Sequence, residues 1–145
     1  MSSPVRILTA VPICDGHDSA INTINLEFIR HGIEVVYLGI HNTAEEIVQS
    51  AVQEDVDAIG ISIHSAAHLS LFQDLANGLK RNKANDILLF GGGIVPAEDL
   101  PALKKFGVKK IFGPGAAIDE IVAFVKAFPG RGRSSKNTAA KRHEL

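Results

Sequence analysis

The chain has 145 residues, of which 46% are hydrophobic and 21% charged, so we expect one soluble globular domain. Its formal net charge of −1 argues against nucleic acid as the main ligand. No apolar run approaches the roughly 20 residues of a membrane span, and no signal peptide precedes the first apolar segment. The single cysteine, Cys14, suits a reducing compartment, so we expect a cytoplasmic protein without membrane contact.

Short apolar segments rich in Val, Ile and Leu alternate along the chain with stretches long enough to form helices. The sequence predicts five strands, at Val5–Val11, Glu34–Leu38, Asp57–Ser62, Asp86–Phe90 and Lys109–Phe112. A capping box of Thr43 and Glu46 predicts the start of the helix after the second strand. The fourth helix is expected from Ala97 to Phe106, ending at Gly107, and the fifth from Ala117 to Phe128.

Five strand–helix units in so short a chain predict an α/β fold with an open parallel sheet and helices on both faces. At this size the expected strand order is 2-1-3-4-5, as in flavodoxin-like folds, with ligands beyond the carboxyl ends of strands one and three. We expect this domain to span residues 1–129. Residues 130–145 form a basic tail that lacks apolar anchors and is expected to be disordered or to dock on an acidic partner surface.

The loop after the first strand contains Asp15-Gly16-His17-Asp18. A histidine that binds a metal through one ring nitrogen needs an acceptor for its other N–H, and that acceptor is often a carboxylate. Asp15 and His17 supply both groups, and Gly16 lets the loop turn tightly. The alternative interpretation is a polar loop whose Asp or Ser caps the next helix.

The loop after the third strand offers a hydroxyl and two histidines. Ser62 could bond a ligand ring placed between the sheet and a helix, or it could cap the third helix. His64 and His68 lie four residues apart and would share a helical face. No Glu or Cys accompanies them, which disfavours a zinc site.

Glycines follow the fourth and fifth predicted strands. Gly91-Gly92-Gly93 would allow a phosphate- or nucleotide-bearing ligand to approach the backbone, and Gly113 lowers the rim beside them. A tight turn would need the same residues. No residue of the chain is a candidate general acid, base or nucleophile for a substrate.

Taken together, these patterns resemble the cobalamin-binding domain of the methylmalonyl-CoA mutase and isobutyryl-CoA mutase family. That family carries Asp-x-His-x-x-Gly, then Ser-x-Leu, then Gly-Gly, and the similarity runs from about Val5 to Val125. The segment Ile-Phe-Gly-Pro-Gly at 111–115 is also typical of it. Ala20 stands where the family has glycine, as in fused isobutyryl-CoA mutases, and His64 stands where it has leucine, which leaves the packing of the axial base open.

The resemblance implies adenosylcobalamin as cofactor, with His17 replacing dimethylbenzimidazole as lower ligand of cobalt and Asp15 holding the histidine ring. It also implies that Ser62 bonds the displaced benzimidazole and that Gly91 and Gly92 make room for the nucleotide tail. The full set of implied cofactor-binding residues is Asp15, Gly16, His17, Asp18, Ser62, His64, Gly91, Gly92, Gly93 and Gly113.

Mutases of this family also need a barrel domain that binds acyl-CoA, for which this chain has no room. We therefore expect a small subunit of an isomerase that is inactive until a separate large subunit joins it. The alternatives are a corrinoid methyl carrier, a cobalamin-dependent regulator, a domain that has lost its cofactor, or a phospho-receiver domain. The last would need an acceptor Asp at the end of the third strand, where Ser62-Ile63 stands.

Overall fold

The computed structural model describes residues 5–11, 19–39, 42–63, 68–93, 95–113 and 116–128. Within them five parallel strands form one sheet in the order β2-β1-β3-β4-β5, which confirms the predicted flavodoxin-like topology. The strands are β1 (Arg6–Ala10), β2 (Glu34–Tyr37), β3 (Ala58–Ile63), β4 (Leu88–Gly93) and β5 (Val108–Phe112). The helices are α1 (Ser19–Arg30), α2 (Ala44–Glu54), α3 (His68–Arg81), α4 (Leu100–Phe106) and α5 (Ile118–Ala127), with a 3-10 turn, η1 (Ala97–Asp99), before α4.

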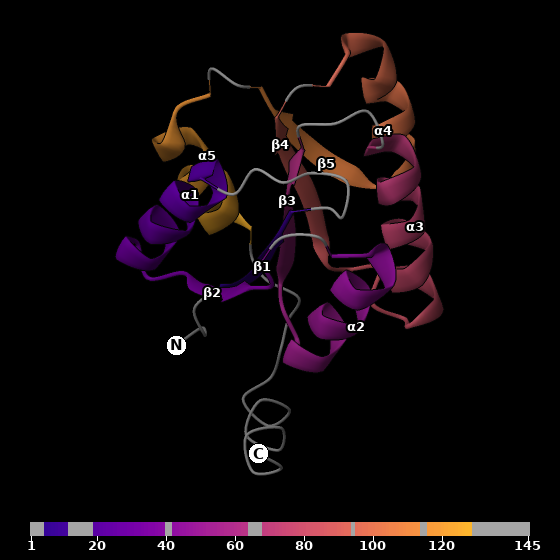
Figure 1. Cartoon of the computed structure of the whole chain (residues 1–145), viewed down its shortest axis with the longest axis horizontal. Helices are drawn as coiled ribbons and strands as arrows, with labels where there is room; N and C mark the ends of the chain where they lie inside the picture. Colours follow the sequence, from indigo (N-terminus) through magenta and orange to yellow (C-terminus); the bar gives the residue numbers. More distant parts are fainter. Residues whose placement is uncertain are drawn as a thin grey trace.

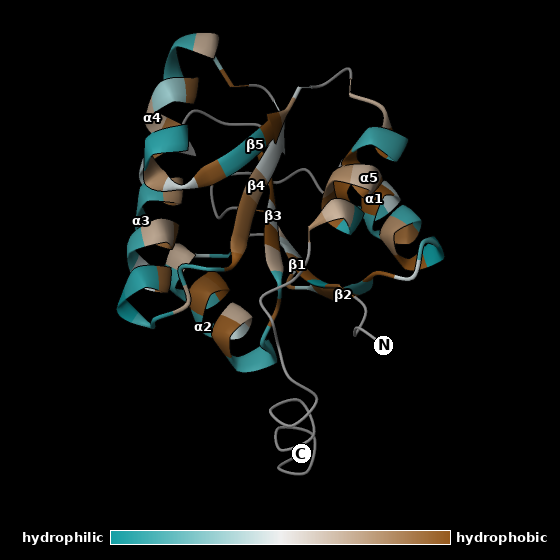
Figure 2. Ribbon diagram, turned by 180° about the vertical axis from the view of Figure 1, so that it is seen from behind, coloured by the Kyte–Doolittle hydropathy of each residue, from teal (hydrophilic) through white to brown (hydrophobic). Residues whose placement is uncertain are grey.

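Two helical layers cover the sheet (Figure 1). Helices α1 and α5 lie on one face, and α2, α3 and α4 lie on the other. Each face has its own cluster of buried apolar side chains, one around Phe28, Phe90 and Val125 and one around Ile59, Phe72 and Leu75. Hydrophobic residues dominate the central strands, as Figure 2 shows, because both faces of a parallel sheet are buried.

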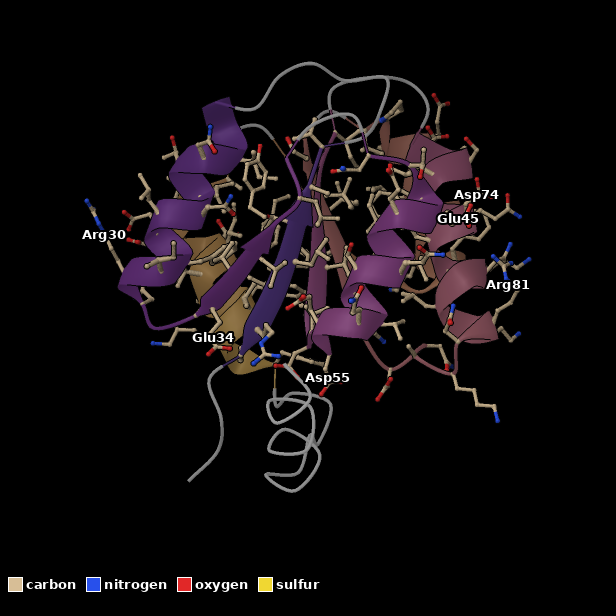
Figure 3. The ribbon with its side chains drawn as sticks, turned by 60° about the horizontal axis from the view of Figure 1, so that its bottom comes forward. Arg30, Glu34, Glu45, Asp55, Asp74 and Arg81 are labelled. Carbon is tan, nitrogen blue, oxygen red and sulfur yellow. The ribbon has the colours of Figure 1, made fainter. Side chains whose placement is uncertain are left out.

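Charged side chains stay on the outside of the helical layers. In Figure 3 Arg30 projects from α1, whereas Glu45, Asp74 and Arg81 project from α2 and α3, away from the sheet. Among the residues described, none of the helices has the length and apolar character needed to cross a membrane.

The predicted helix ends are confirmed at two positions. The Thr43 N–H donates to Glu46 Oε1 at 2.8 Å, and the Glu46 N–H donates to Thr43 Oγ1 at 3.1 Å, so the capping box is complete. Gly107 ends α4 with φ of 105°, a left-handed conformation that favours glycine.

Two predicted boundaries are wrong. The fourth strand begins at Leu88 and continues through Gly91, Gly92 and Gly93, which were expected to form a loop. Pairing of these glycines with the end of β3 outweighs their poor intrinsic strand preference. The fourth helix was expected to be continuous from Ala97. It opens instead with the 3-10 turn η1, because Pro101, which has no N–H, is tolerated only in the first turn of α4.

Candidate functional site

Of the predicted site residues, the structure describes Ser62, Gly91, Gly92, Gly93 and Gly113, all at the carboxyl edge of the sheet. Asp15, Gly16, His17, Asp18 and His64 lie outside the described residues. These residues follow β1 and β3 in the sequence. The two strands pair in parallel, with Ala10 opposite Ile61. β1 and β3 therefore end at the same edge of the sheet, as the predicted topology requires.

The strand register brings three of the predicted positions together. Ser62 on β3 pairs with Gly92 on β4, and Gly92 pairs in turn with Phe112 on β5, directly before Gly113. Residues from three separate chain segments thus form one row across the end of the sheet.

A cavity of about 420 Å³ lies beside this row, between the sheet and the helices α1 and α5. Its volume falls within the range of about 300–1,000 Å³ that small-molecule pockets occupy. It reaches from Thr9 and Gly60 in mid-sheet to Gly93 and Gly113 at the carboxyl edge. A slot of this depth can receive a slender apolar group inserted from that edge.

The floor of the cavity is flat because the strands present small residues toward α1 and α5. These residues are Thr9, Gly60, Ser62 and Gly92. Among the described residues, a Cβ atom on Gly92 would meet only the Phe112 carbonyl oxygen, at 3.8 Å, so a side chain at Gly92 would extend into open space. A Cβ on Gly60 would approach the Phe90 ring to 2.9 Å. Glycine at position 92 therefore keeps the slot open, whereas glycine at position 60 allows the Phe90 ring to pack against β3.

The three consecutive glycines have different physical roles. A Cβ on Gly91 would meet the Phe72 ring at 2.9 Å and Ile63 Cδ1 at 3.0 Å, within the opposite core that packs against α3. Gly93 has φ of 139°, and a Cβ there would overlap the Ile63 carbonyl oxygen. Gly91 thus allows close packing, Gly93 allows the close approach of β3 and β4, and Gly92 opens the cavity.

Three aromatic rings pack against one another at one side of the cavity. Phe90 and Phe112, which line it, stand edge to face with ring centroids 6.2 Å apart. Phe124 on α5 contacts both rings edge-on, at 5.5 Å and 5.4 Å. Such pairs add stability beyond their buried area, so this wall is fixed without a ligand.

The sequence did not predict that helical residues line a cavity. The helical walls include Ile21, Thr23, Ile24 and Phe28 from α1 and Ile118 and Ile121 from α5. The signal was present in α1, because positions 21, 24 and 28 recur at helical spacing. That spacing alone would predict a filled core. Only the docking of the two helices on the sheet shows that part of the space between them is empty.

A buried polar pair at the inner end of the cavity was also missed. Thr9 Oγ1 donates to Asn25 Oδ1 at 2.9 Å, and the two residues are 2% and 7% exposed. The bond joins β1 to α1 behind the apolar lining. It satisfies two polar groups that would otherwise be buried without partners.

A further polar residue, Asn42, lies beside the end of β1. Its backbone N–H donates to the Val11 carbonyl oxygen at 3.2 Å. The loop after β2 therefore borders the point from which the segment with Asp15 and His17 departs. Sequence reasoning did not single out Asn42.

In the described part of the chain, no group of three or more His, Cys, Asp or Glu side chains is placed so that it could hold a metal ion. His64 of the disfavoured two-histidine zinc site lies outside the described residues.

Comparison with known structures supports the fold. A cobalamin-binding protein from Desulfitobacterium hafniense superposes with a TM-score of 0.74 at 21% identity, over 88% of this chain and 60% of that one. The chemotaxis protein CheY4 from Vibrio cholerae gives 0.64 at 12% identity, over 86% of this chain and 98% of that one. These likenesses concern the fold alone. For a receiver function, β3 still lacks an Asp at its end, where Ser62 and Ile63 stand.

Sequence comparison identifies the class. Residues 5–123 match the family described as B12 binding domain, so the chain is a cobalamin-binding domain. It is 36% identical to the 2-hydroxyisobutanoyl-CoA mutase small subunit of Aquincola tertiaricarbonis, over 86% of this chain and 95% of that protein. It is 35% identical to the pivalyl-CoA mutase small subunit of Xanthobacter autotrophicus, over 92% and 89%. A fused isobutyryl-CoA mutase of Geobacillus kaustophilus is 37% identical, but the chain spans only 10% of its length.

The chain belongs to the family of cobalamin-binding small subunits of acyl-CoA mutases. These enzymes are isomerases, and small subunits of this kind pair with a large mutase subunit. The resemblance inferred from Asp15-Gly16-His17, Ser62 and the glycines is thereby confirmed at the level of the family.

Proposed function

We propose that this chain holds adenosylcobalamin for a carbon-skeleton mutase, with the nucleotide tail of the cofactor inserted between the sheet and helices α1 and α5. The observation that carries the proposal is the 420 Å³ cavity, open at Gly92 and walled by aliphatic and aromatic side chains. Such walls suit an aromatic base such as dimethylbenzimidazole once it leaves cobalt. The chemistry of the slot therefore fits the cofactor of the family.

In this arrangement His17 would hold the cobalt of the cofactor, and Asp15 would accept the other N–H of its ring. The support is their position in a segment that follows β1, at the edge where the cavity opens. A carboxylate partner of this kind fixes the histidine tautomer and raises its basicity. Gly16, Asp18 and His64 are proposed as neighbours of the cofactor in the same segments.

Ser62, Gly93 and Gly113 are proposed to border the inserted tail, with the Ser62 hydroxyl as its hydrogen-bonding group. Ser62 stands on the floor of the cavity beside Gly92. The role given to Gly91 and Gly92 together is best assigned to Gly92, because a side chain at Gly91 would point into the α3 core.

The cofactor supplies homolysis of its cobalt–carbon bond, and the protein supplies binding and orientation. The apolar walls from α1 and α5 would exclude water from the tail, and residues at the carboxyl edge would hold the corrin. We propose that a large subunit with a barrel-shaped substrate domain closes over that edge and keeps water from the reacting groups.

For the substrate we propose a short, branched acyl-CoA. The supporting observation is that the relatives compared above are named for 2-hydroxyisobutanoyl, pivalyl and isobutyryl groups. We also propose a cytoplasmic location, because the single cysteine, Cys14, suits a reducing compartment.

Purification after incubation with adenosylcobalamin tests the proposal. The expected result is a stoichiometric complex whose absorption spectrum is that of cofactor without coordinated dimethylbenzimidazole. We expect no acyl-CoA turnover by this chain alone, and turnover when the mutase large subunit from the same organism is added. Turnover by the isolated chain would contradict the subunit model, and a failure to retain cofactor would contradict the proposed site.

A further inference from the structure

Asn42 is oriented by two hydrogen bonds at the carboxyl edge of the sheet. Its backbone N–H donates to the Val11 carbonyl oxygen at 3.2 Å, and its Nδ2 donates to the Leu38 carbonyl oxygen at 3.4 Å, a long bond. The Val11 N–H donates in turn to the Gly39 carbonyl oxygen at 3.2 Å. The end of β1 and the loop after β2 are thus tied together, and Asn42 is held between them.

The side-chain oxygen of Asn42 takes part in none of these hydrogen bonds. Asn42 Oδ1 is shielded from solvent and has no hydrogen-bond partner among the residues that the structure describes. It is also the one buried side-chain atom found in this condition in that part of the chain. Native proteins leave few buried acceptors unpaired, so we expect a partner for this oxygen from outside the described residues.

Capping of α2 does not explain why an asparagine stands at position 42. Asn42 precedes α2, where an Asn often caps the first turn. That task belongs to Thr43, whose Oγ1 accepts the Glu46 N–H at 3.1 Å, while Glu46 closes the capping box. The side-chain oxygen of Asn42 is therefore not needed by the helix beside it.

The place of Asn42 indicates which donor can reach it. Val11, to which it is bonded, is the last described residue before the segment that carries Asp15 and His17. Cobalamin at this edge would bring a ring whose rim carries primary amides on acetamide and propionamide arms. A shielded oxygen can be reached by a slender, flexible arm but not by the face of a corrin ring.

We propose that Asn42 Oδ1 accepts a hydrogen bond from a propionamide N–H of the bound corrin. The proposal rests on the proposed function, because it requires cobalamin at the carboxyl edge. It makes Asn42 a cofactor-binding residue on the loop after β2, separate from the cavity that takes the tail. A donor there would pair an acceptor that the described residues leave unpaired, which favours the bound state.

The first test replaces Asn42 with leucine, which has a similar shape and no acceptor. We expect Asn42→Leu to leave the melting temperature of the cofactor-free domain nearly unchanged, since it removes an unpaired acceptor together with the long bond to the Leu38 carbonyl oxygen. Its affinity for cobalamin, measured by absorbance titration, should fall by about 5- to 10-fold. Asn77→Leu on the exposed surface of α3 is the matched control, and its affinity should not change.

The second test identifies the donor. In each cobalamin monocarboxylic acid, one propionamide is hydrolysed to a carboxylate and loses its N–H. One of these derivatives should bind the wild type more weakly than cobalamin does, and Asn42→Leu should remove most of that difference. If every derivative loses the same factor in both proteins, Asn42 does not contact a propionamide and the inference is wrong. A wild type that binds no cobalamin would instead overturn the proposed function.

Discussion

Ser62 and Gly92 stand side by side on β3 and β4, and both face the cavity beneath α1 and α5. A Cβ at Gly92 would find its nearest neighbour among the described residues, the Phe112 carbonyl oxygen, at 3.8 Å. The pair therefore combines a hydroxyl with open space at the mouth of a mainly apolar slot. Ser62 and Gly92 thus leave room for a cofactor, whereas the neighbouring Gly91 and Gly93 serve the packing of the fold.

Gly92→Val should block the slot without unfolding the domain. The new side chain enters space that the structure leaves empty, and valine is favoured in strands. We expect a change in unfolding free energy within about 0.5 kcal/mol. Cobalamin affinity should fall by about 5- to 150-fold, which is the cost of overpacking the inserted tail. Chemical denaturation and absorbance titration measure the two quantities.

Gly91→Ala is the matched contrast, because its methyl group would meet Phe72 and Ile63 on the opposite face. It should lower the unfolding free energy by about 1–3 kcal/mol, as overpacking does. If Gly92→Val bound cobalamin as tightly as the wild type, the tail would have to lie elsewhere.

Thr9→Val tests the buried polar pair. Valine fills the volume of threonine but leaves Asn25 Oδ1 without the donor that now lies 2.9 Å away. The unfolding free energy should fall by about 1–3 kcal/mol. Adding Asn25→Leu should recover part of the loss, since neither polar group then remains unpaired. Strict additivity of the two changes in denaturant titrations would show that the hydrogen bond contributes little.

Asp15→Ala should weaken cobalamin binding by about 10- to 100-fold, the usual effect of removing a partner that orients a metal ligand. Asp15→Asn should be milder, because its amide oxygen still accepts the histidine N–H. Equilibrium titration with cobalamin ranks the three proteins. Equal affinity for the wild type and Asp15→Ala would reduce Asp15 to a loop or capping residue.

The fold was predictable because its signals are local. Apolar runs at strand length, the Thr43–Glu46 capping box and Gly107 each describe a few neighbouring residues, and right-handed crossovers then limit the topology. The glycines of β4 were assigned to a loop because their pairing with β3 is not local. The cavity walls and the Thr9–Asn25 bond depend on how α1 docks on the sheet, which periodicity does not determine. The unpaired oxygen of Asn42 is likewise a property of tertiary packing.

We propose that a histidine of this chain, His17, replaces dimethylbenzimidazole on cobalt. Electron paramagnetic resonance of the cob(II)alamin complex tests it, with the protein labelled with ¹⁵N-histidine. Coordination by histidine predicts that the label changes the axial-nitrogen splitting from a triplet to a doublet, and that His17→Ala abolishes the effect of the label. A triplet that persists in the labelled wild type would mean that dimethylbenzimidazole remains on cobalt, which would contradict the account.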